Sequence, residues 1–515
     1  MTASTSADAE LQDRVFAFLT DPTAHPGVHR IDTHAAAVFL DGARALKIKR
    51  AVRFPYLDYS TLAKRKAACD EEIQVNRPFA PQIYHRVVPI TQNTDGSLSI
   101  NGSGAPVEFA IEMTRFDEQQ TIDHLAEAGE LDSGLVDAIA DAIAASHAVA
   151  PLAPAEPWIK SIPAIIDDNT AAFRTAACFF ASDVDGLEEA SQSAFSRIRT
   201  LLEQRAKRGH VRRCHGDLHL ANIVLIEHEP VLFDAIEFDP AIASVDVVYD
   251  LAFPIMDLLR YGRHAAANAL LNRYLAPASF EHADALAALP LFMSLRAAIR
   301  AKVLLARLGS SSRDKAEIID SAQDYFKLAL QLIRPVAPSL VAVGGLSGTG
   351  KSVLARAIAP LVMPQPGAVV LRSDVLRKQQ FGINETERLP ESAYQPEMTA
   401  TIYQLLVQRA LLVLSQGHSV VVDAVFARED ERTAIQGIAR KLNIRFVGLF
   451  LQTDLATRVS RVGRRQRDAS DATPEIAGQQ EQYDIGAIDW HIIDASGTPE
   501  QTRERCQARI APEAV

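Results

Sequence analysis

The stretch that decides the fold of the C-terminal part of the chain reads Gly345-Leu346-Ser347-Gly348-Thr349-Gly350-Lys351-Ser352. It fits the pattern GxxxxGK[ST] and lies between an apolar strand pattern and a helical pattern. Glycines let successive backbone N–H groups close around phosphate oxygens without Cβ clashes, and the N-terminus of the following helix adds a favourable dipole. The octet therefore predicts a nucleotide-phosphate loop, in which Lys351 reaches the β and γ phosphates and Ser352 holds Mg²⁺.

Strands alternate with helical patterns throughout this part of the chain. Apolar strand patterns occupy residues 340–343, 368–371, 419–423, 446–451 and 490–493. Continuous apolar strands separated by helices are typical of a parallel sheet that is covered on both faces. Two prolines, Pro335 and Pro338, follow an amphipathic helical pattern and cannot continue it. We therefore expect a domain boundary there and an α/β domain over 339–515.

Charged side chains follow two of these strands. Asp374 comes just after the second strand and Asp423 ends the third, at the sheet edge where ligands bind in such folds. Asp423 is a candidate Mg²⁺ ligand, and Asp374 a candidate for orienting or deprotonating an acceptor hydroxyl. A second interpretation is that Asp374 only caps a helix beginning at Val375. Arg377 could pair with an anionic group on the acceptor, so we expect a small, polyhydroxylated acceptor that could also be acidic.

Arginines crowd one short segment further on, at positions 458, 461, 464, 465 and 467. A basic helix that closes over a triphosphate neutralises the charge that develops during phosphoryl transfer. The alternative is a solvated helix face. No aromatic residue separates these arginines, which disfavours a base-stacking polynucleotide site.

Residues 339–515 resemble the small P-loop kinases of the gluconate kinase, polynucleotide kinase and zeta-toxin group. The resemblance rests on GLSGTGKS, on RSDVLRK from Arg372, on VVVDAVF from Val420 and on RVGRRQRDASDA from Arg461. It implies that Asp374 faces the acceptor, that Arg461 and Arg465 are catalytic lid arginines, and that the loop at 494–498 borders the adenine.

A second motif, in the first half of the chain, reads His215-Gly216-Asp217-Leu218-His219-Leu220-Ala221-Asn222. Asp217 and Asn222 lie five residues apart, and Asp234 follows Asn222 by twelve, at the end of an apolar run. This is the spacing of the kinase catalytic loop, in which the Asp accepts the proton of the attacking hydroxyl and the Asn joins a second carboxylate on Mg²⁺. Asp217 is then the catalytic base, Asn222 and Asp234 are metal ligands, and His215 orients the loop without transferring protons.

The N-terminal part resembles the aminoglycoside phosphotransferase-like branch of the protein-kinase fold over about 25–335. The resemblance implies an α+β domain over 1–335, with a small lobe over about 25–115 and a helical lobe over about 116–335. It also implies a phosphate-binding Lys47 paired with Glu72, a hinge near Met113 that binds adenine, and structural support of the catalytic loop by Asp250. Lys49 is a close rival of Lys47, because both side chains point to the same face of a strand. The stretch 30–35, where a glycine-rich loop would lie, holds no glycine.

Composition narrows the class of protein. The 515 residues carry 53 basic and 64 acidic side chains, a net charge of −11, so the chain lacks the field of a general nucleic-acid binder. Its four cysteines show no disulfide or metal spacing, and we see no leader and no run of about 18 apolar residues. We therefore expect a cytoplasmic protein that does not enter membranes; its oligomeric state stays open.

These patterns together predict a bifunctional phosphotransferase that uses ATP and Mg²⁺ at two separate sites on small hydroxylated metabolites. Two alternatives stay open. The P-loop domain could act on nucleic-acid ends or nucleotide-sugars, or one domain could bind ATP only to regulate the other.

Overall fold

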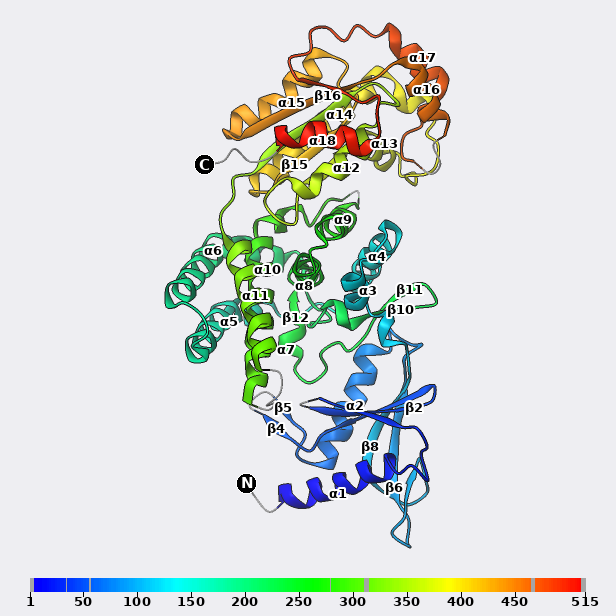
Figure 1. Cartoon of the computed structure of the whole chain (residues 1–515), viewed down its shortest axis with the longest axis vertical. Helices are drawn as coiled ribbons and strands as arrows, with labels where there is room; N and C mark the ends of the chain where they lie inside the picture. Colours follow the sequence, from blue (N-terminus) through cyan, green and yellow to red (C-terminus); the bar gives the residue numbers. More distant parts are fainter. Residues whose placement is uncertain are drawn as a thin grey trace. The chain divides into compact units, whose positions relative to one another are not determined.

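The computed structural model describes residues 4–33, 35–54, 57–277, 279–309, 315–464 and 468–510 (Figure 1). Internal contacts divide the chain into two compact units. Unit 1 contains Met1–Ile162 and Leu202–Asp257, and unit 2 contains Pro163–Leu201 and Leu258–Val515. The predicted domain boundary at 335–339 lies inside unit 2, and it stays a prediction.

Unit 1 is built on a six-stranded antiparallel sheet in the order β1-β2-β3-β8-β6-β7. Residues 35–50 read as a strand, a tight turn at Asp41-Gly42 and a second strand, which predicts a β-hairpin. In the structure this turn joins β2 and β3, and Gly42 takes the positive φ that a two-residue turn requires. The predicted hairpin is therefore confirmed. The strands are β1 (His29–Asp32), β2 (Ala36–Asp41), β3 (Arg44–Lys49), β6 (Tyr84–Gln92), β7 (Leu98–Ile100) and β8 (Ala105–Thr114).

Each face of this sheet is covered by apolar side chains. On one face, Val15 and Phe16 of α1 (Ser4–Leu19) pack against Phe39 and Ile48. On the other face, Cys69 of α2 (Leu62–Asn76) packs against Ile111. The pattern at 62–76 predicts α2, but the polar N-terminal stretch gave no prediction of α1.

The rest of unit 1 includes the catalytic-loop motif and the short strands that flank it. Strands β9 and β12 pair with each other, and β10 and β11 form a hairpin between the two predicted metal ligands. The remaining elements are the β4–β5 pair (Arg53–Phe54, Leu57–Asp58), α3 (Ile122–Ala128), α4 (Ser133–Val149), β9 (Val211–Arg213), β10 (Ile223–Ile226), β11 (Glu229–Leu232), α7 (Pro240–Ala243), β12 (Ser244–Asp246) and most of α8 (Val247–Arg260).

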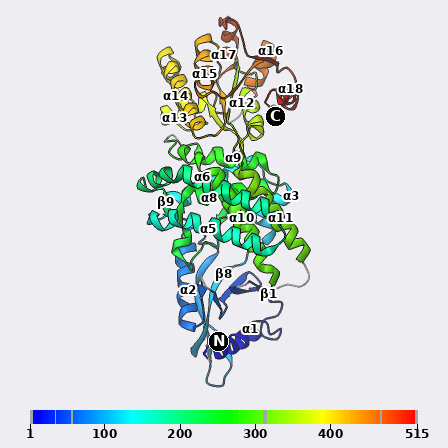
Figure 2. The same ribbon diagram turned by 90° about the vertical axis from the view of Figure 1, so that its left-hand side faces the viewer.

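Unit 2 begins with helices and ends with a parallel sheet (Figures 1 and 2). In its helical part Phe173, Phe179 and Phe326 contact one another, and Ser294 donates to the carbonyl of Ala329. Its helices before residue 335 are α5 (Ala155–Ala176) and α6 (Ala181–Lys207), both shared with unit 1, and α9 (His264–Leu275), α10 (Leu289–Ala306) and α11 (Lys315–Ile333).

The sheet of unit 2 has five parallel strands in the order β14-β15-β13-β16-β17, and these strands match the five predicted apolar runs. Helices cover both faces, and the core includes Val341, Ala355, Val421 and Leu449. The predicted α/β fold is confirmed. Its elements are β13 (Ser339–Gly345), α12 (Lys351–Ile358), β14 (Val369–Arg372), α13 (Ser373–Gln380), α14 (Pro396–Ser415), β15 (Val420–Asp423), α15 (Glu429–Leu442), β16 (Arg445–Gln452), α16 (Leu455–Gly463), α17 (Pro474–Gln479), β17 (His491–Asp494) and α18 (Pro499–Ile510).

The edge strand β14 finds hydrogen-bond partners in α9. The amide N–H of Val370 donates to Oδ1 of Asn272 at 2.7 Å, and the amide nitrogens of Asn268 and Asn272 donate to the carbonyl of Ala368. Unpaired backbone groups at a sheet edge are costly when buried, so these side chains stabilise the strand that ends at Arg372.

One described helix, α14, is long and apolar enough to cross a membrane by length and composition. About a third of its apolar 18-residue stretch is buried inside the protein, 33%. The core helix of a soluble protein passes the same test. Here α14 contacts β14, β15 and the helices on either side of it in sequence, so it is an integral part of the fold of unit 2.

Candidate functional site

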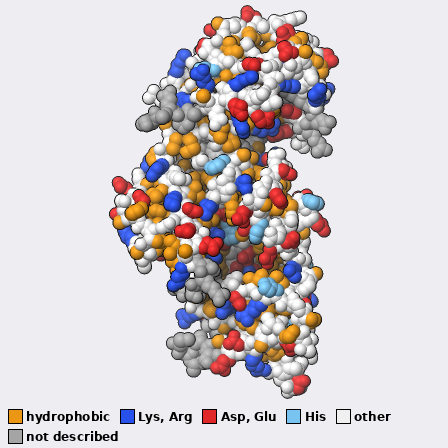
Figure 3. All heavy atoms as spheres, in the orientation of Figure 1, with side chains coloured by type: hydrophobic (Ala, Val, Ile, Leu, Met, Phe, Trp, Pro, Cys, Tyr) orange, Lys and Arg blue, Asp and Glu red, His pale blue; other side chains and the backbone are white. Residues whose placement is uncertain are grey.

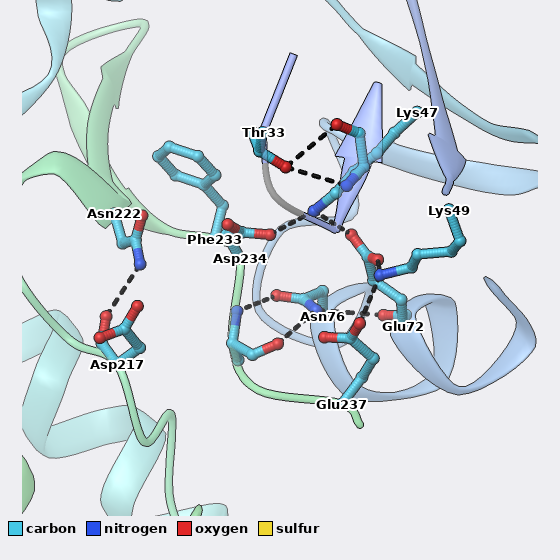
Figure 4. Close-up of polar contacts among 12 residues, drawn as sticks. Thr33, Lys47, Lys49, Glu72, Asn76, Asp217, Asn222, Phe233, Asp234 and Glu237 are labelled. Atoms are coloured by element: carbon cyan, nitrogen blue, oxygen red, sulfur yellow. Dashed lines mark hydrogen bonds and ion pairs between the residues drawn. The ribbon is translucent and has the colours of Figure 1, made fainter. Parts of the chain in front are cut away.

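The first candidate site lies in unit 1, where two lysines converge on one buried glutamate (Figure 4). Nζ of Lys47 lies 2.8 Å from Oε1 of Glu72 and also contacts the carboxylate of Asp234. Lys49 also contacts Glu72, but its second partner is Glu237 and not Asp234. Lys47 is therefore the lysine that connects the buried glutamate to the predicted metal ligand, whereas Lys49 is held away from it.

The charges in this cluster support one another. Burial alone would lower the pKa of the Lys47 ammonium, but Asp234 and Glu72 outweigh it and the pKa lies well above its ordinary value. Burial alone would raise the pKa of Asp234, yet Lys47 outweighs it and the pKa is lowered. Glu72 is completely buried between the two lysines. The cluster thus keeps Lys47 positive and Asp234 negative, as phosphate and metal binding require.

Asp234 occupies an unusual backbone conformation. Its φ is +61°, in the left-handed region that non-glycine residues seldom adopt. Its amide N–H donates to the hydroxyl of Tyr84 at 3.1 Å, and the neighbouring Ala235 N–H donates to Asn76. Such strain persists only where surrounding contacts hold it, and these two bonds hold the Asp234 carboxylate toward Lys47.

The catalytic-loop motif is fixed from below by Asp250. One oxygen of its buried carboxylate accepts the backbone N–H of His215 and the other that of Gly216, at 3.3 and 3.0 Å, which confirms the supporting role expected of Asp250. The His215 ring donates from Nε2 to the carbonyl of Phe233 at 2.8 Å. Burial lowers the pKa of His215, so the ring is neutral near pH 7. His215 thus connects the catalytic loop to the residue before Asp234, and its orienting role stays a prediction.

Asp217 and Asn222 lie together, and in Figure 4 Asp234 lies between them and Lys47. Nδ2 of Asn222 donates to the backbone carbonyl of Asp217 at 2.8 Å. The Asp217 side chain is 44% exposed and lies 3.4 Å from Nε2 of His219. An accessible carboxylate can reach a bound hydroxyl, so the geometry is compatible with a base.

Two other predictions for this site concern the nucleotide. Met113 is buried near the end of β8, and its contact with adenine stays a prediction. Beside the stretch 30–35, the Ala36 N–H donates to Oγ1 of Thr33 at 2.9 Å, and the Thr33 N–H donates to the Ala36 carbonyl at 2.8 Å. His34 lies outside the described residues. Two hydrogen bonds thus join Thr33 and Ala36 in a segment that holds no glycine.

The second candidate site is the predicted phosphate loop in unit 2, between β13 and α12. Gly345, Gly348 and Gly350 have φ values of +135°, +90° and +94°. A Cβ on Gly348 would lie 2.6 Å from the carbonyl oxygen of Arg458, whereas one on Gly350 would meet nothing within 4 Å. Gly348 therefore permits close packing of the loop on α16, and Gly350 keeps the loop open where a phosphate would bind.

A cavity of about 1210 Å³ opens beside this loop. Ser347, Lys351 and Ser352 line it, as do Asp374 and Asp423. Thr349 is buried and donates to the carbonyl of Leu346 at 2.8 Å, an interaction within the loop. Five of the predicted residues thus share one cavity.

Arg372 organises the carboxylates at the end of the sheet. Its guanidinium lies 3.3 Å from Asp423 and 3.0 Å from Asp468. Burial raises the pKa of the Asp374 carboxyl, and the Asp423 carboxylate adds to that rise, while Lys351 and Arg372 partly offset it. Helix α13 begins at Ser373 with Arg372 at its N-cap position, so the alternative role of Asp374 as the cap is wrong.

The arginines of the predicted lid have different partners. Arg458 is buried and donates to the carbonyl of Ala477. Arg461 donates to the carbonyls of Ala495 and Gly497 at 2.8 and 2.7 Å, and so binds the loop expected to border adenine. Arg465, like the residues at 466 and 467, lies outside the described residues. The lid function of Arg461 and Arg465 stays a prediction.

The donor sets suit Mg²⁺-nucleotide at both places. Mg²⁺ prefers oxygen ligands, and Asn222 with Asp234 in unit 1, or Ser352 with Asp423 in unit 2, would supply amide, hydroxyl and carboxylate oxygens. The open space beside Gly350 and the ammonium of Lys351 suit a phosphate. Sequence reasoning missed the contact of Glu237 with Lys49, the hydrogen bond from the Ser347 N–H to Gln480, and the bond from Arg458 to the carbonyl of Ala477. None of these three contacts follows from a recognisable motif.

Several known proteins are similar to parts or most of this chain. Residues 340–483 match the family model described as an AAA domain. An uncharacterized protein of Mycobacterium tuberculosis (strain H37Rv) is 29% identical over 499 residues, 93% of this chain and 95% of the relative. A gluconokinase from Sinorhizobium meliloti is 19% identical, with a TM-score of 0.25 over 34% of this chain and 94% of that one. A choline/ethanolamine kinase family protein from Mesorhizobium loti is 14% identical, with a TM-score of 0.36 over 63% and 99%.

The N-terminal part has the protein-kinase-like arrangement of an antiparallel sheet, a Lys–Glu pair and a catalytic loop, and the C-terminal part has the parallel sheet and phosphate loop of a P-loop protein.

Proposed function

We propose that the chain is a bifunctional ATP- and Mg²⁺-dependent phosphotransferase that acts on small hydroxylated acceptors at two separate sites. The observation that carries the proposal is that each site combines a lysine, a set of oxygen ligands for Mg²⁺ and a further carboxylate. In unit 1 these are Lys47, Asn222 with Asp234, and Asp217. In unit 2 the corresponding groups line one cavity.

At the first site, Asp217 would accept the proton of the acceptor hydroxyl while the hydroxyl oxygen attacks the γ phosphorus. The bond between the γ phosphorus and the bridging oxygen of ADP would then break. Lys47 would hold the phosphates, with Glu72 keeping it in place. At the second site, Lys351 and the loop N–H groups would hold the phosphates, and Asp374 would take the role of base. Bound Mg²⁺ would neutralise phosphate charge at either site.

The lining of the second cavity bears on its acceptor. Arg377 is engaged by the carbonyl of Ala393 and by the ring of Tyr394. Three basic side chains line the cavity, Lys351, Arg377 and Arg428, against seven acidic ones at positions 374, 391, 423, 430, 431, 471 and 484. A neutral polyhydroxylated acceptor therefore suits the cavity better than an acidic one.

Nucleic acid is disfavoured as a partner of either site. The net charge is −11, and on the face drawn in Figure 3 the Lys and Arg side chains are interspersed with Asp and Glu side chains. An extended basic surface is the usual footprint of nucleic-acid binding. We propose free metabolites of the cytoplasm as acceptors.

The test is a metabolite pool incubated with γ-labelled ATP and the full-length protein. We expect labelled products of two kinds, one lost in Asp217→Asn and the other lost in Lys351→Ala. Transfer of no label by the wild-type protein, or loss of both products in each single variant, would contradict the proposal.

A further inference from the structure

Gln480 lies where the phosphate loop meets the segment after α17. It begins the short helix Gln480–Gln482, the residue is 6% exposed, and it lines the same cavity as Lys351 and Asp374. The backbone N–H of Ser347 donates to Oε1 of Gln480 at 2.7 Å, although the two residues are 133 positions apart. This bond attaches the Gln480 carboxamide directly to the loop.

The bond also fixes which way the carboxamide faces. A backbone N–H can only donate, so the atom opposite Ser347 has to be the oxygen, and the NH₂ group points elsewhere. Among the described residues, Nε2 of Gln480 has no hydrogen-bond partner. Two donor hydrogens of a nearly buried side chain are thus left without a protein acceptor beside the phosphate loop.

The segment that carries Gln480 is held in place from both sides. Arg458 donates to the carbonyl of Ala477 at 2.8 Å and contacts the carboxylate of Glu481. Because the backbone of Arg458 also packs against Gly348, the same arginine ties this segment to the phosphate loop. The carboxamide is therefore positioned before any nucleotide binds, as an electrostatic contribution to catalysis requires.

We propose that Gln480 is a catalytic residue of the C-terminal site, whose Nε2 donates a hydrogen bond to the phosphoryl group in transfer. The inference rests on the proposed function of this site. In the step, the acceptor oxygen forms a bond to the γ phosphorus while its proton passes to Asp374. The bond from phosphorus to the bridging oxygen breaks, and its electron pair stays on ADP. Gln480 exchanges no proton; it stabilises the charge on the phosphoryl oxygens.

Gln480→Glu separates this role from a structural one. The carboxylate of the variant still accepts the Ser347 N–H, but it replaces the donor NH₂ with an oxygen. Gln482→Glu is the matched control, because Gln482 is exposed, lines the same cavity and would add the same charge. Full-length proteins are titrated with Mg²⁺-ADP, with and without aluminium fluoride, which mimics the transferring phosphoryl group. Lys351→Ala measures the signal of the N-terminal site, which is subtracted.

We expect Gln480→Glu to bind Mg²⁺-ADP within about threefold of wild type and to lose about 30-fold or more of the affinity for the aluminium fluoride complex. Gln482→Glu should change neither by more than about threefold. If Gln480→Glu bound the aluminium fluoride complex as tightly as wild type does, the inference would be overturned. An equal loss of affinity for Mg²⁺-ADP alone would also overturn it, because it would mean that Gln480 only shapes the loop. If aluminium fluoride raised the affinity of wild type for Mg²⁺-ADP no more than it raised that of Lys351→Ala, the proposed function of the C-terminal site would fail instead.

Discussion

Replacing each of the two lysines on β3 by methionine tests the assignment of the N-terminal phosphate site. Lys47 contacts Asp234, the predicted metal ligand, and its side chain is 14% exposed. Lys49 is 4% exposed and is paired with Glu72 and Glu237. Methionine keeps most of the length of the side chain and removes the charge, so both variants preserve packing better than alanine would.

The magnitudes follow from the partners. A hydrogen bond to a charged group contributes about 1.5–3 kcal/mol, so Lys47→Met should weaken binding of Mg²⁺-ATP at this site by about 10- to 150-fold. Lys49→Met removes one partner from a buried ion pair, which costs about 3–5 kcal/mol of folding free energy. Because Lys49 does not contact Asp234, its variant should keep nucleotide affinity within about threefold.

The assay is calorimetric titration with Mg²⁺ and a non-hydrolysable ATP analogue, in a Lys351→Ala background that silences the C-terminal site. Urea unfolding of the same proteins reports the stability of each variant. If Lys49→Met lost as much affinity as Lys47→Met while remaining folded, the assignment of Lys47 as the phosphate lysine would be wrong.

Three further perturbations test other parts of the account. Asp217→Asn should abolish N-terminal phosphoryl transfer with ATP affinity kept within a few fold, whereas Asp234→Asn should weaken Mg²⁺-ATP itself; equal losses of binding would refute the division into base and metal ligand. Gly350→Ala should lower the free energy of unfolding by about 1–2 kcal/mol, from its positive φ alone. Gly348→Ala should lower it by about 3 kcal/mol or more, because the added methyl would also lie 2.6 Å from a backbone oxygen. Equal unfolding midpoints of the two variants without nucleotide would contradict this. Burial lowers the pKa of His418 to about 4, so the unfolded chain takes up a proton below about pH 6.5 that the folded chain does not. Between pH 7 and pH 4 the wild type should therefore lose about 3 kcal/mol more of its free energy of unfolding than His418→Gln does. Parallel curves of unfolding free energy against pH for the two proteins would refute this.

Much of the fold could be predicted because its signals are local. The helix at 62–76 and the five parallel strands follow from periodicity and apolar runs, and the structure places them within one or two residues of the expected bounds. Helix α1 could not be predicted from its polar composition. It folds because Val15, Phe16 and Leu19 cover one face of the sheet, a contact that only the assembled sheet provides.

The candidate sites divide in the same way. The residues within motifs come together as expected, because each motif is a single loop. The choice between Lys47 and Lys49 depended on Asp234 and Glu237, which are nearly 190 positions away in the sequence. Gln480 was invisible because its contact with Ser347 exists only after α16 and α17 have packed on the phosphate loop.

The number of nucleotides bound per chain tests the central claim, two separate ATP sites, most directly. Titration of the full-length protein with Mg²⁺ and a non-hydrolysable ATP analogue should give two bound per chain. Lys47→Met and Lys351→Ala should each leave one, and the double variant should leave none. A single nucleotide per wild-type chain would contradict the account.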